Sequence, residues 1–521
     1  MRSLVALACV VACIAGTSGV SVSYAGSPAA DAGIAWQVAS SDAEVNRAFE
    51  VARKSGKPLF LYWGAVWCPP CNQVKATLFS RADFIERSRS FVPVYVDGDK
   101  PGAQKVASRF NVSGYPTMVL LKADGTEITR LPGEVDPEQY LMTLSAALGS
   151  QFPVKELVDR ALAGRSLSTE QWQLLAFYSW DTDDQQIFRS ADVGNRLSAL
   201  AGFAPDTAVA DRLRLKAAAA RAQEGQDAQR HVDEAMRTSD LASVEQVLSD
   251  SGRALRQADL LIAFADSLLP YVAPEKKARA NLAATWDTAL NTLIDANKLS
   301  RSDSLDALDA RIVMWRAIGA SVPLSKEQQA FVLAEASRVV AATTDRFERQ
   351  AVVPSAAHVL ASAGLVAESD AMLKSELHRA VAPYYHMLGL ASNAKLRGDK
   401  RAALQWYERA WRSSEGAATR LQWGTGFVRE LIDLAPDESQ RIFSATSAVI
   451  GALDAKPETF YGRNERSLKK MASKLVTWQA ADPLRLRKDA DLRSQLTAKC
   501  RPLPERDQGK VNCLAVFAQK S

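Results

Sequence analysis

The sequence predicts two structural parts, an α/β domain near the N-terminus and a larger all-helical region after it. Up to residue 150, strand-like apolar runs alternate with apolar residues at helical spacing. From Phe152 onward, Leu, Ala, Arg, Gln and Glu dominate, and helical periods are separated by short breaks. The length of 521 residues also exceeds what one ordinary hydrophobic core accommodates.

Composition and charge exclude several classes of protein. Hydrophobic residues make up 47% of the chain and charged residues 24%, as in a folded soluble protein. The net charge of +5 is spread along the chain, so neither nucleic acid nor an anionic membrane surface is indicated as a partner. After the N-terminal region, no apolar segment reaches the length needed to cross a bilayer.

Residues 1–25 are predicted to be a signal peptide. Arg2 supplies the positive start, Leu4–Ile14 the apolar run, and Ser23–Ala25 a cleavage site with small residues at both ends. A bacterial signal of this type directs the chain to the periplasm, an oxidising compartment. Two alternatives stay open, a lipid anchor at Cys13 and a simple apolar N-terminal helix.

Residues 26–150 are expected to form the α/β domain. Its first helix is predicted over Ser41–Lys57, with Ser41 or Asp42 as N-cap and a stop at Gly56, and a buried strand over Pro58–Val66 follows. The later expected elements are a helix opened by the cysteine pair, a strand over Phe91–Asp97, a helix over Ala103–Asn111, a hairpin over Thr117–Leu131 that turns at Ala123–Gly125, and a helix beginning at Asp136 or Pro137.

Residues 151–490 are expected to form stacked antiparallel helix pairs, because single pairs cannot bury their apolar faces alone. The clearest unit, residues 384–417, resembles a tetratricopeptide repeat with its turn at Gly398–Asp399. Residues 491–521 form a tail that contains two prolines and the pair Cys500 and Cys513.

The segment Trp67-Cys68-Pro69-Pro70-Cys71 carries the candidate chemistry. Two intervening residues allow both sulfurs to meet across the first helical turn. The helix N-terminus favours the thiolate of Cys68, which is the attacking species in thiol–disulfide exchange. Cys71, one turn further on, is placed to resolve the mixed disulfide.

Two segments resemble motifs of the thioredoxin superfamily. Trp67–Cys71 is similar to its W-C-x-P-C motif, and Val112–Thr117 to its V-x-G-x-P-T segment, with Pro116 at the cis-proline position. Asp124-Gly125 and Gly133 also fall where such domains place a hairpin and a late glycine. The resemblance covers residues 34–149 and is strongest to the C-terminal domain of periplasmic thiol:disulfide interchange proteins.

The resemblance implies a thioredoxin-like fold and protein-disulfide oxidoreductase activity. It assigns Cys68 as nucleophile, Cys71 as resolving cysteine, and Trp67, Tyr115 and Pro116 as the wall that faces the client. The backbone at Tyr115 then pairs with an extended client segment. Expected partners are client proteins with disulfides and an upstream thiol electron donor; no organic or metal cofactor is implied.

The sequence departs from the family in one respect. Many thioredoxins bury a carboxylate on the strand before the motif, whereas Lys57–Trp67 contains neither Asp nor Glu and has Tyr62 at the expected place. The resemblance therefore leaves open which group accepts the proton of Cys71.

Other interpretations of the cysteine pair stay open. An inert structural disulfide and half of a zinc site are the alternatives to redox activity. Pro69 and Pro70 lack N–H groups that could stabilise the Cys68 thiolate, and no histidine separates the cysteines, which favours a reductase. An oxidase or isomerase using the same residues remains an alternative, as does an interaction protein with a regulatory redox domain.

The remaining candidates lie in the helical region and the tail. Cys500 and Cys513 are expected to form a structural disulfide that clamps an irregular tail, with exchange with Cys68 or unpaired thiols as alternatives. Helical repeats commonly bind protein segments, so the region is expected to dock partners. Four aromatic residues are expected to be core or, alternatively, to line a groove: Trp406, Tyr407, Trp411 and Trp423. Three histidines lack metal-ligand spacing: His358, His378 and His386.

Overall fold

The computed structural model describes most of the chain after the predicted signal peptide. The described residues are 33–100, 102–133, 136–183, 186–228, 233–320, 323–482, 485 and 489–518. The predicted signal peptide, residues 1–25, and the alternative lipid site at Cys13 lie outside the described residues.

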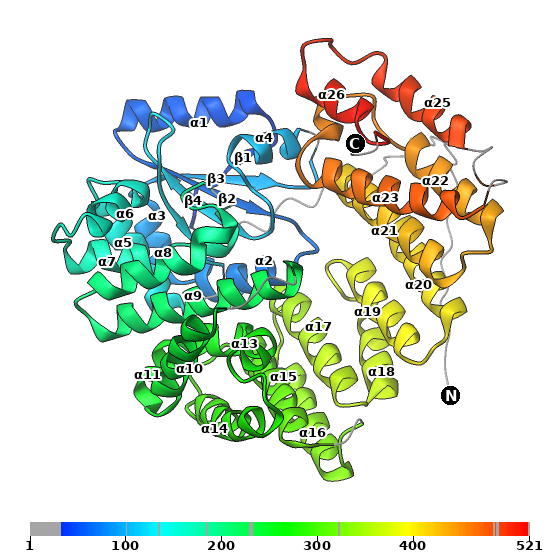
Figure 1. The fold of residues 1–521 in the computed structure, drawn as a ribbon. Coiled ribbons are helices and arrows are strands. Elements are labelled where there is room, and N and C mark those ends of the chain that lie inside the picture. Colours follow the sequence, from blue (N-terminus) through cyan, green and yellow to red (C-terminus); the bar gives the residue numbers. More distant parts are fainter. Residues whose placement is uncertain are drawn as a thin grey trace, which may run out of the picture.

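A five-stranded mixed sheet forms the centre of the N-terminal domain (Figure 1). The strands are β1 (Gln37–Ala39), β2 (Leu59–Gly64), β3 (Val92–Asp97), β4 (Thr117–Leu121) and β5 (Glu127–Leu131). They lie in the order β1-β3-β2-β4-β5; β1, β3 and β2 are parallel, whereas β4 is antiparallel to β2 and to β5. Every residue of β2 and β3 is buried, which explains their continuous apolar runs. Both strands and the β4–β5 hairpin were predicted, and the structure confirms them.

The described helices of this domain are α1 (Asp42–Ser55), α2 (Pro69–Val74), α3 (Ala82–Ser88), α4 (Ala103–Arg109) and α5 (Pro137–Gly149), and a π-helical turn over Lys75–Phe79 follows α2. The first and the last of them follow the predicted capping signals, whereas α3 was not predicted. Ser41 caps α1 by accepting from the Glu44 N–H, and Gly56 ends it with φ of 65°. Asp136 caps α5, so the expected start is confirmed.

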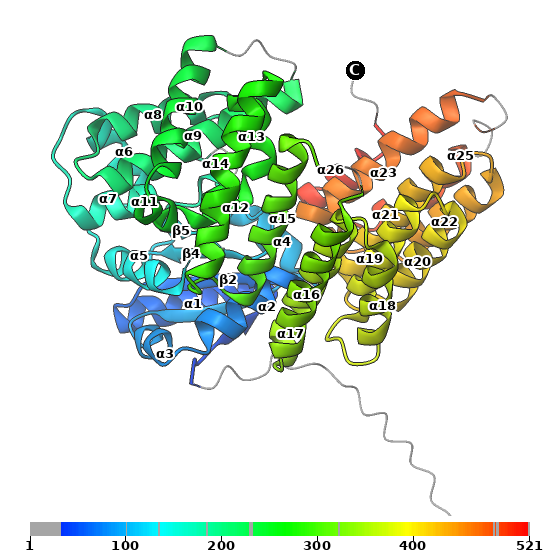
Figure 2. The same cartoon turned by 90° about the horizontal axis from the view of Figure 1, so that it is seen from below.

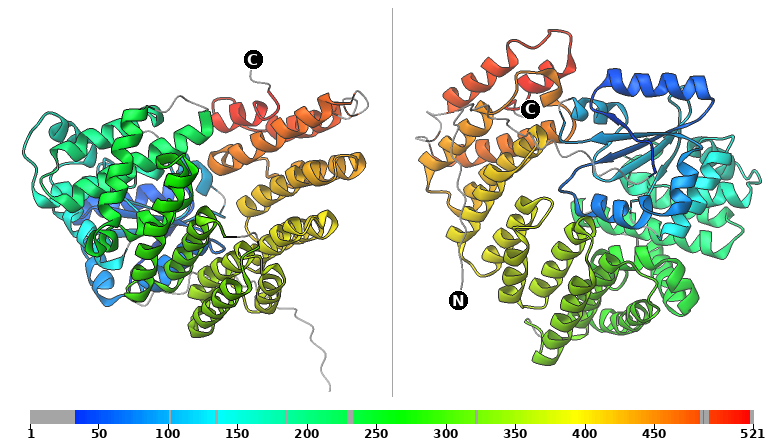
Figure 3. Two further views of the ribbon diagram at one scale, coloured as in Figure 1. Left: turned by 60° about the horizontal axis from the view of Figure 1, so that its bottom comes forward. Right: turned by 180° about the vertical axis from the view of Figure 1, so that it is seen from behind.

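The chain after residue 150 is helical in its described parts, and consecutive helices stack in an arc (Figures 1 and 3). The first half comprises α6 (Val154–Leu162), α7 (Thr169–Ala176), α8 (Ser190–Phe203), α9 (Thr207–Ala228), α10 (Glu234–Leu248), α11 (Ser251–Arg256), α12 (Ala258–Ala263), α13 (Ala265–Val272), α14 (Lys276–Asp295), α15 (Arg301–Ile318) and α16 (Lys326–Ala342). The second half comprises α17 (Arg346–Ser362), α18 (Val366–Glu376), α19 (Pro383–Leu396), α20 (Lys400–Ser413), α21 (Ala417–Leu434), α22 (Ser439–Gly451), α23 (Gly462–Ala480), α25 (Asp489–Cys500) and α26 (Gln508–Leu514).

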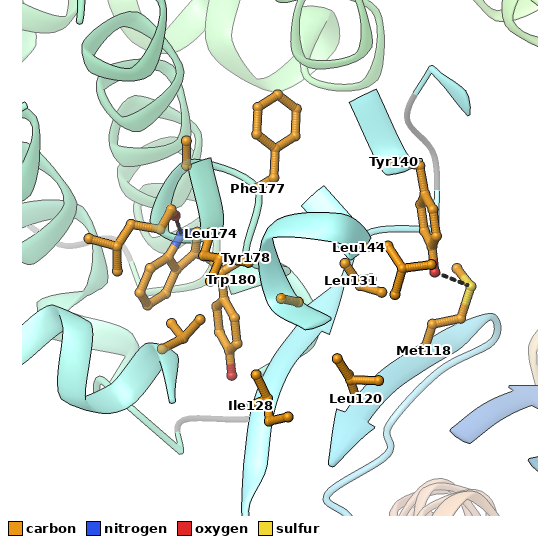
Figure 4. Packing of buried hydrophobic residues seen from close by; sticks show 14 of the residues in the cluster. Met118, Leu120, Ile128, Leu131, Tyr140, Leu144, Leu174, Phe177, Tyr178 and Trp180 are labelled. Atoms are coloured by element: carbon orange, nitrogen blue, oxygen red, sulfur yellow. Dashed lines mark hydrogen bonds between the residues drawn. The ribbon is translucent and has the colours of Figure 1, made fainter. Parts of the chain in front are cut away.

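The arc begins on the sheet and ends beside it. Leu120 of β4 and Ile128 of β5 share one core with Leu144 of α5, and this core continues to Leu174 and Trp180 (Figure 4). The core thus crosses the predicted domain boundary at residue 150. At the other end of the arc, α23 packs against α4 (Figure 1).

Between these ends, α17 lies alongside α2 (Figures 1 and 2). Helices α19 and α20 form an antiparallel pair at the position of the predicted repeat unit, and Gly398 makes its turn with φ of 74°. Among the described residues, no helix combines the length and apolarity needed to cross a bilayer. The tail, expected to be irregular, instead contains α25 and α26, with both prolines between them.

Candidate active site

The cysteine pair begins α2, as predicted. Cys68 is the N-cap and Pro69 the first helical residue, a position where the missing N–H has no cost. The Cys71 N–H donates to Sγ of Cys68 at 3.2 Å. The two residues form a disulfide with 5.3 Å between their Cα atoms. The two-residue spacing thus brings both sulfurs together across one turn.

Pairing of β2 with β4 brings the Pro116 segment to the same end of the sheet as the cysteines. Trp63 of β2 is opposite Thr117 of β4, so Pro116 lies next to the strand that leads into the motif. The Tyr115–Pro116 peptide bond is cis, as the resemblance implied. Gly133 faces this proline; a Cβ at Gly133 would lie 2.8 Å from Cγ of Pro116.

Tyr115 is held by α4 and the loop after β3. Its hydroxyl accepts a hydrogen bond from Nε2 of Gln104 at 2.9 Å. A Cβ at Gly98 would lie 2.3 Å from this hydroxyl, so a larger residue at position 98 would displace the Tyr115 ring. Oε1 of Gln104 in turn accepts from the Arg463 backbone N–H at 3.0 Å, which connects this network to α23.

Trp67 contacts side chains from the helical region. Its Nε1 donates to the Thr419 hydroxyl at 2.8 Å, and that hydroxyl donates to the carboxylate of Asp99. The Trp67 ring stacks on Tyr385, with centroids 5.9 Å apart, and meets Trp423 edge-on at 5.8 Å. These contacts join the motif to α19 and α21.

Two carboxyl groups lie at the end of β3, next to the motif. Asp97 is the last residue of β3, is buried, and is paired with Gly64 at the end of β2; Asp99, in the loop after β3, is half-buried. Burial, reinforced by the negative charge of Asp97, raises the pKa of Asp99 to about 7, although its hydrogen bond with Thr419 opposes the shift. Burial also raises the pKa of Asp97.

Tyr62 occupies the place where many thioredoxins have a carboxylate. Its hydroxyl donates to the backbone carbonyl of Cys71 at 3.4 Å, so Tyr62 contacts Cys71 through the backbone. Asp97 at the end of β3 and Asp99 in the loop after it place two carboxyl groups at the end of the strand that pairs with Tyr62.

Of the four aromatic residues considered as core or groove, Trp423 belongs to the site through its contacts with Trp67 and with Tyr384, whose ring centroid lies 4.8 Å away. Trp411 is 7% exposed and stacks on Phe427 inside the helical region, which fits the core interpretation. Trp406 and Tyr407 also pack on helical core clusters.

Cys500 and Cys513 form the second disulfide. It joins the end of α25 to α26, with 5.7 Å between the Cα atoms, and both residues are fully buried. The pair lies in the core of α20–α26, whereas Cys68 belongs to a separate cluster with Ala382 and Tyr384. Among the described residues, no cluster of three or more histidine, cysteine or acidic side chains could hold a metal ion.

Sequence reasoning missed the residues that reach the motif from distant parts of the chain. Thr419 lies 352 positions after its partner Trp67, and Gln350 lies 283 positions after it. Neither residue type carries a local signal. The glycine at position 416 is a partial signal, because its φ of 84° and its approach to Asp99 fix the start of α21 against the α/β domain.

Comparison with known proteins matches residues 45–148 to the family described as thioredoxin-like domain. The thioredoxin of Mycolicibacterium smegmatis is 33% identical over 94 residues, which cover 18% of this chain and 81% of that protein. The thiol:disulfide interchange protein DsbD of Pseudomonas fluorescens is 30% identical over 125 residues, 23% of this chain and 21% of that protein.

A TPR repeat-containing thioredoxin of Arabidopsis thaliana, TDX, is 32% identical over 99 residues, which cover 18% of this chain and 23% of that protein. The chain spans about a fifth of the length of the DsbD proteins that it matches. The similarity is therefore to one part of those proteins.

Proposed function

We propose that this chain, which belongs to the thioredoxin family, is an exported thiol–disulfide oxidoreductase that reduces or exchanges disulfides in client proteins. The observation that carries the proposal is the Cys68–Cys71 disulfide at the start of α2, next to a thioredoxin-like sheet. The similarity to thiol:disulfide interchange proteins over this part of the chain supports the same reaction class.

In the proposed reaction, the Cys68 thiolate attacks one sulfur of a client disulfide. A mixed disulfide forms, and the other client sulfur leaves as a thiolate. The Cys71 thiolate then attacks Sγ of Cys68, which releases the second client thiolate and forms the Cys68–Cys71 disulfide. Two electrons pass from the chain to the client, and an upstream thiol donor restores the dithiol.

Trp67, Tyr115 and Pro116 form the client-facing wall in this proposal. Tyr62 lies against the backbone of Cys71, and Asp99 is a half-buried carboxyl group near Trp67 whose pKa of about 7 suits proton exchange at neutral pH. No other cofactor is required, because the two sulfurs carry the electrons.

The location and partners are part of the same proposal. The predicted signal peptide, residues 1–25, favours the periplasm, and the similarity to thiol:disulfide interchange proteins is consistent with an oxidising compartment; a lipid anchor at Cys13 is the alternative. The tetratricopeptide-like pair α19–α20 and its neighbours are proposed to dock protein partners, and Cys500–Cys513 to stabilise the last two helices.

Trapping of mixed disulfides tests the proposal. In the full-length Cys71→Ala variant, the Cys68 thiolate attacks a client but no resolving thiol releases it. We expect covalent adducts with client proteins that a reducing agent cleaves, and no such adducts with the matched Cys68→Ala/Cys71→Ala variant. Equal adduct formation by the two variants would refute a nucleophilic role for Cys68.

A second candidate function is an interaction protein in which the redox domain is regulatory. The observation that favours it is the covering of the cysteine pair by the helical region, since Cys68 is only 2% exposed. A Cys68→Ser variant that keeps the biological phenotype of the wild type would support this function, whereas loss of the phenotype would support the enzyme.

A further inference from the structure

Both sulfur-bearing residues of the site are covered by the chain itself. Cys68 is 2% exposed and Cys71 is fully buried. Their cluster includes Trp67 from the α/β domain and Ala382 and Tyr384 from the start of α19. The face that the proposed function assigns to client proteins is therefore occupied by the helical region.

Six side chains of α17, α19, α21 and α23 make this contact, and we call them the aromatic cover. They are Gln350, Tyr384, Tyr385, Thr419, Trp423 and Arg463. Their aromatic members lie around Trp67, which stacks on Tyr385 and meets Trp423 edge-on.

Polar groups of the aromatic cover also bind the motif. The Gln350 side chain donates to the Trp67 carbonyl at 3.4 Å and accepts from the Ala382 N–H at 3.1 Å. The Arg463 guanidinium stands 4.5 Å from the ring centroid of Tyr115 and 5.8 Å from that of Trp67. The cover thus contacts two of the three residues assigned to the client-facing wall.

The two ends of the helical arc hold the α/β domain in different ways. Helices α6–α9 share a continuous apolar core with the sheet. Beyond the aromatic cover, the chain from α15 to α26 contributes several polar contacts to the domain. Gln73 donates to Asp303 at 3.0 Å, Arg466 donates to the Ser113 carbonyl at 3.0 Å, and Lys105 pairs with Asp507 at 2.7 Å. Polar contacts of this kind are typical of interfaces that separate and re-form.

We propose that the aromatic cover is a reversible intramolecular lid on Cys68 and Cys71, which must move away before a folded protein can form a mixed disulfide with this chain. The inference rests on the proposed function. Exchange requires the attacking sulfur to reach Cys68 or Cys71, and both residues are buried in a cluster that includes residues of α19, which leaves no access for a partner as large as a folded domain.

The reaction that the lid controls needs no reactant other than a protein dithiol and the Cys68–Cys71 disulfide. A thiolate of a protein dithiol attacks one sulfur of the Cys68–Cys71 disulfide, and the other sulfur leaves as a thiolate. The second thiolate of the partner then attacks the mixed disulfide. The partner is oxidised to a disulfide, and this chain gains two electrons as the Cys68–Cys71 dithiol.

The test compares a large and a small reductant of the oxidised full-length protein. The large probe is a purified, reduced thioredoxin, and the small probe is the phosphine TCEP. Reduction is followed by quenching with an alkylating reagent and by the mass of the peptide that contains Cys68 and Cys71. The measured quantity is the ratio of the thioredoxin rate to the TCEP rate.

Two variants loosen the cover, and a third is the matched control. Trp423→Ala is expected to raise the ratio about 30-fold, the effect of losing a central aromatic residue from an interface. Arg463→Ala is expected to raise it about fivefold through loss of the cation–π contacts. Trp406→Ala, on α20 and outside the cover, is expected to leave the ratio unchanged.

The lid proposal would be overturned if Arg463→Ala and Trp423→Ala gave the same ratio of rates as Trp406→Ala. If Trp423→Ala loses its helical circular dichroism, the Arg463→Ala ratio decides alone. The proposed function would fail with a different result. Thioredoxin would reduce Arg463→Ala and Trp423→Ala rapidly, which supports the lid, but none of the reduced proteins would transfer electrons to the disulfides of insulin.

Discussion

Replacement of Asp99 by asparagine is expected to stabilise the protein at pH 8 much more than at pH 4.5. Burial raises the pKa of Asp99 from 3.8 to about 7 in the folded protein, so the folded state holds its proton more tightly than the unfolded chain. Stability that depends on this proton is fully present below pH 3.8. It is lost as the pH rises to about 7, because the unfolded chain has then released the proton.

The size of the effect follows from the two pKa values. Their full difference corresponds to ~4 kcal/mol, and the part that develops between pH 4.5 and pH 8 to ~3 kcal/mol. Asparagine keeps the shape of Asp99 and an oxygen that accepts from Thr419 but carries no charge. Relative to wild type, the free energy of unfolding of Asp99→Asn is therefore expected to rise by ~3 kcal/mol over this pH range.

The assay is urea-induced unfolding of the full-length protein, followed by tryptophan fluorescence at both pH values. Asp192→Asn, at an exposed position in α8, is the matched control. Its free energy of unfolding is expected to differ from that of wild type by the same amount at both pH values. If the difference between Asp99→Asn and wild type also stays constant within about 1 kcal/mol, the burial argument for Asp99 is wrong.

Two further predictions concern a close contact and the second disulfide. Gly133→Ala is expected to destabilise the protein by ~1–3 kcal/mol, because its Cβ would lie 2.8 Å from Pro116. Gly149→Ala, where nothing lies within 4 Å, is the control, and equal unfolding midpoints for the two variants would refute the contact. Cys500→Ser/Cys513→Ser is expected to lower stability by ~3 kcal/mol while the rate of insulin reduction stays at the wild-type value. A large loss of that rate would indicate electron exchange between the two pairs.

Local signals in the sequence predict the α/β domain well. The Ser41 cap and Gly56 stop of α1, the apolar runs of β2 and β3, and the Gly125 turn each act within a few residues. The cysteine spacing likewise determines that Cys68 and Cys71 meet across one helical turn. Each of these features is local, so one sequence is sufficient to predict it.

The surroundings of the motif are not encoded locally. Thr419 reaches Asp99 across 320 positions, and Arg463 reaches Tyr115 from α23. These contacts depend on how the helices stack into an arc, and neither composition nor periodicity specifies the curvature of that stack. The expectation of an irregular tail was wrong for a related reason. The two prolines mark only the loop between α25 and α26, and the disulfide holds both helices in the core.

The decisive measurement is the reduction potential of the Cys68–Cys71 pair, obtained by equilibrating the full-length protein with glutathione and thioredoxin buffers. For a reductase we expect a value between roughly −200 and −300 mV, in the range of reductases of this class. A value below about −300 mV would identify an inert structural disulfide, and a value near −120 mV an oxidant. Either result would contradict a reductase that exchanges electrons through Cys68.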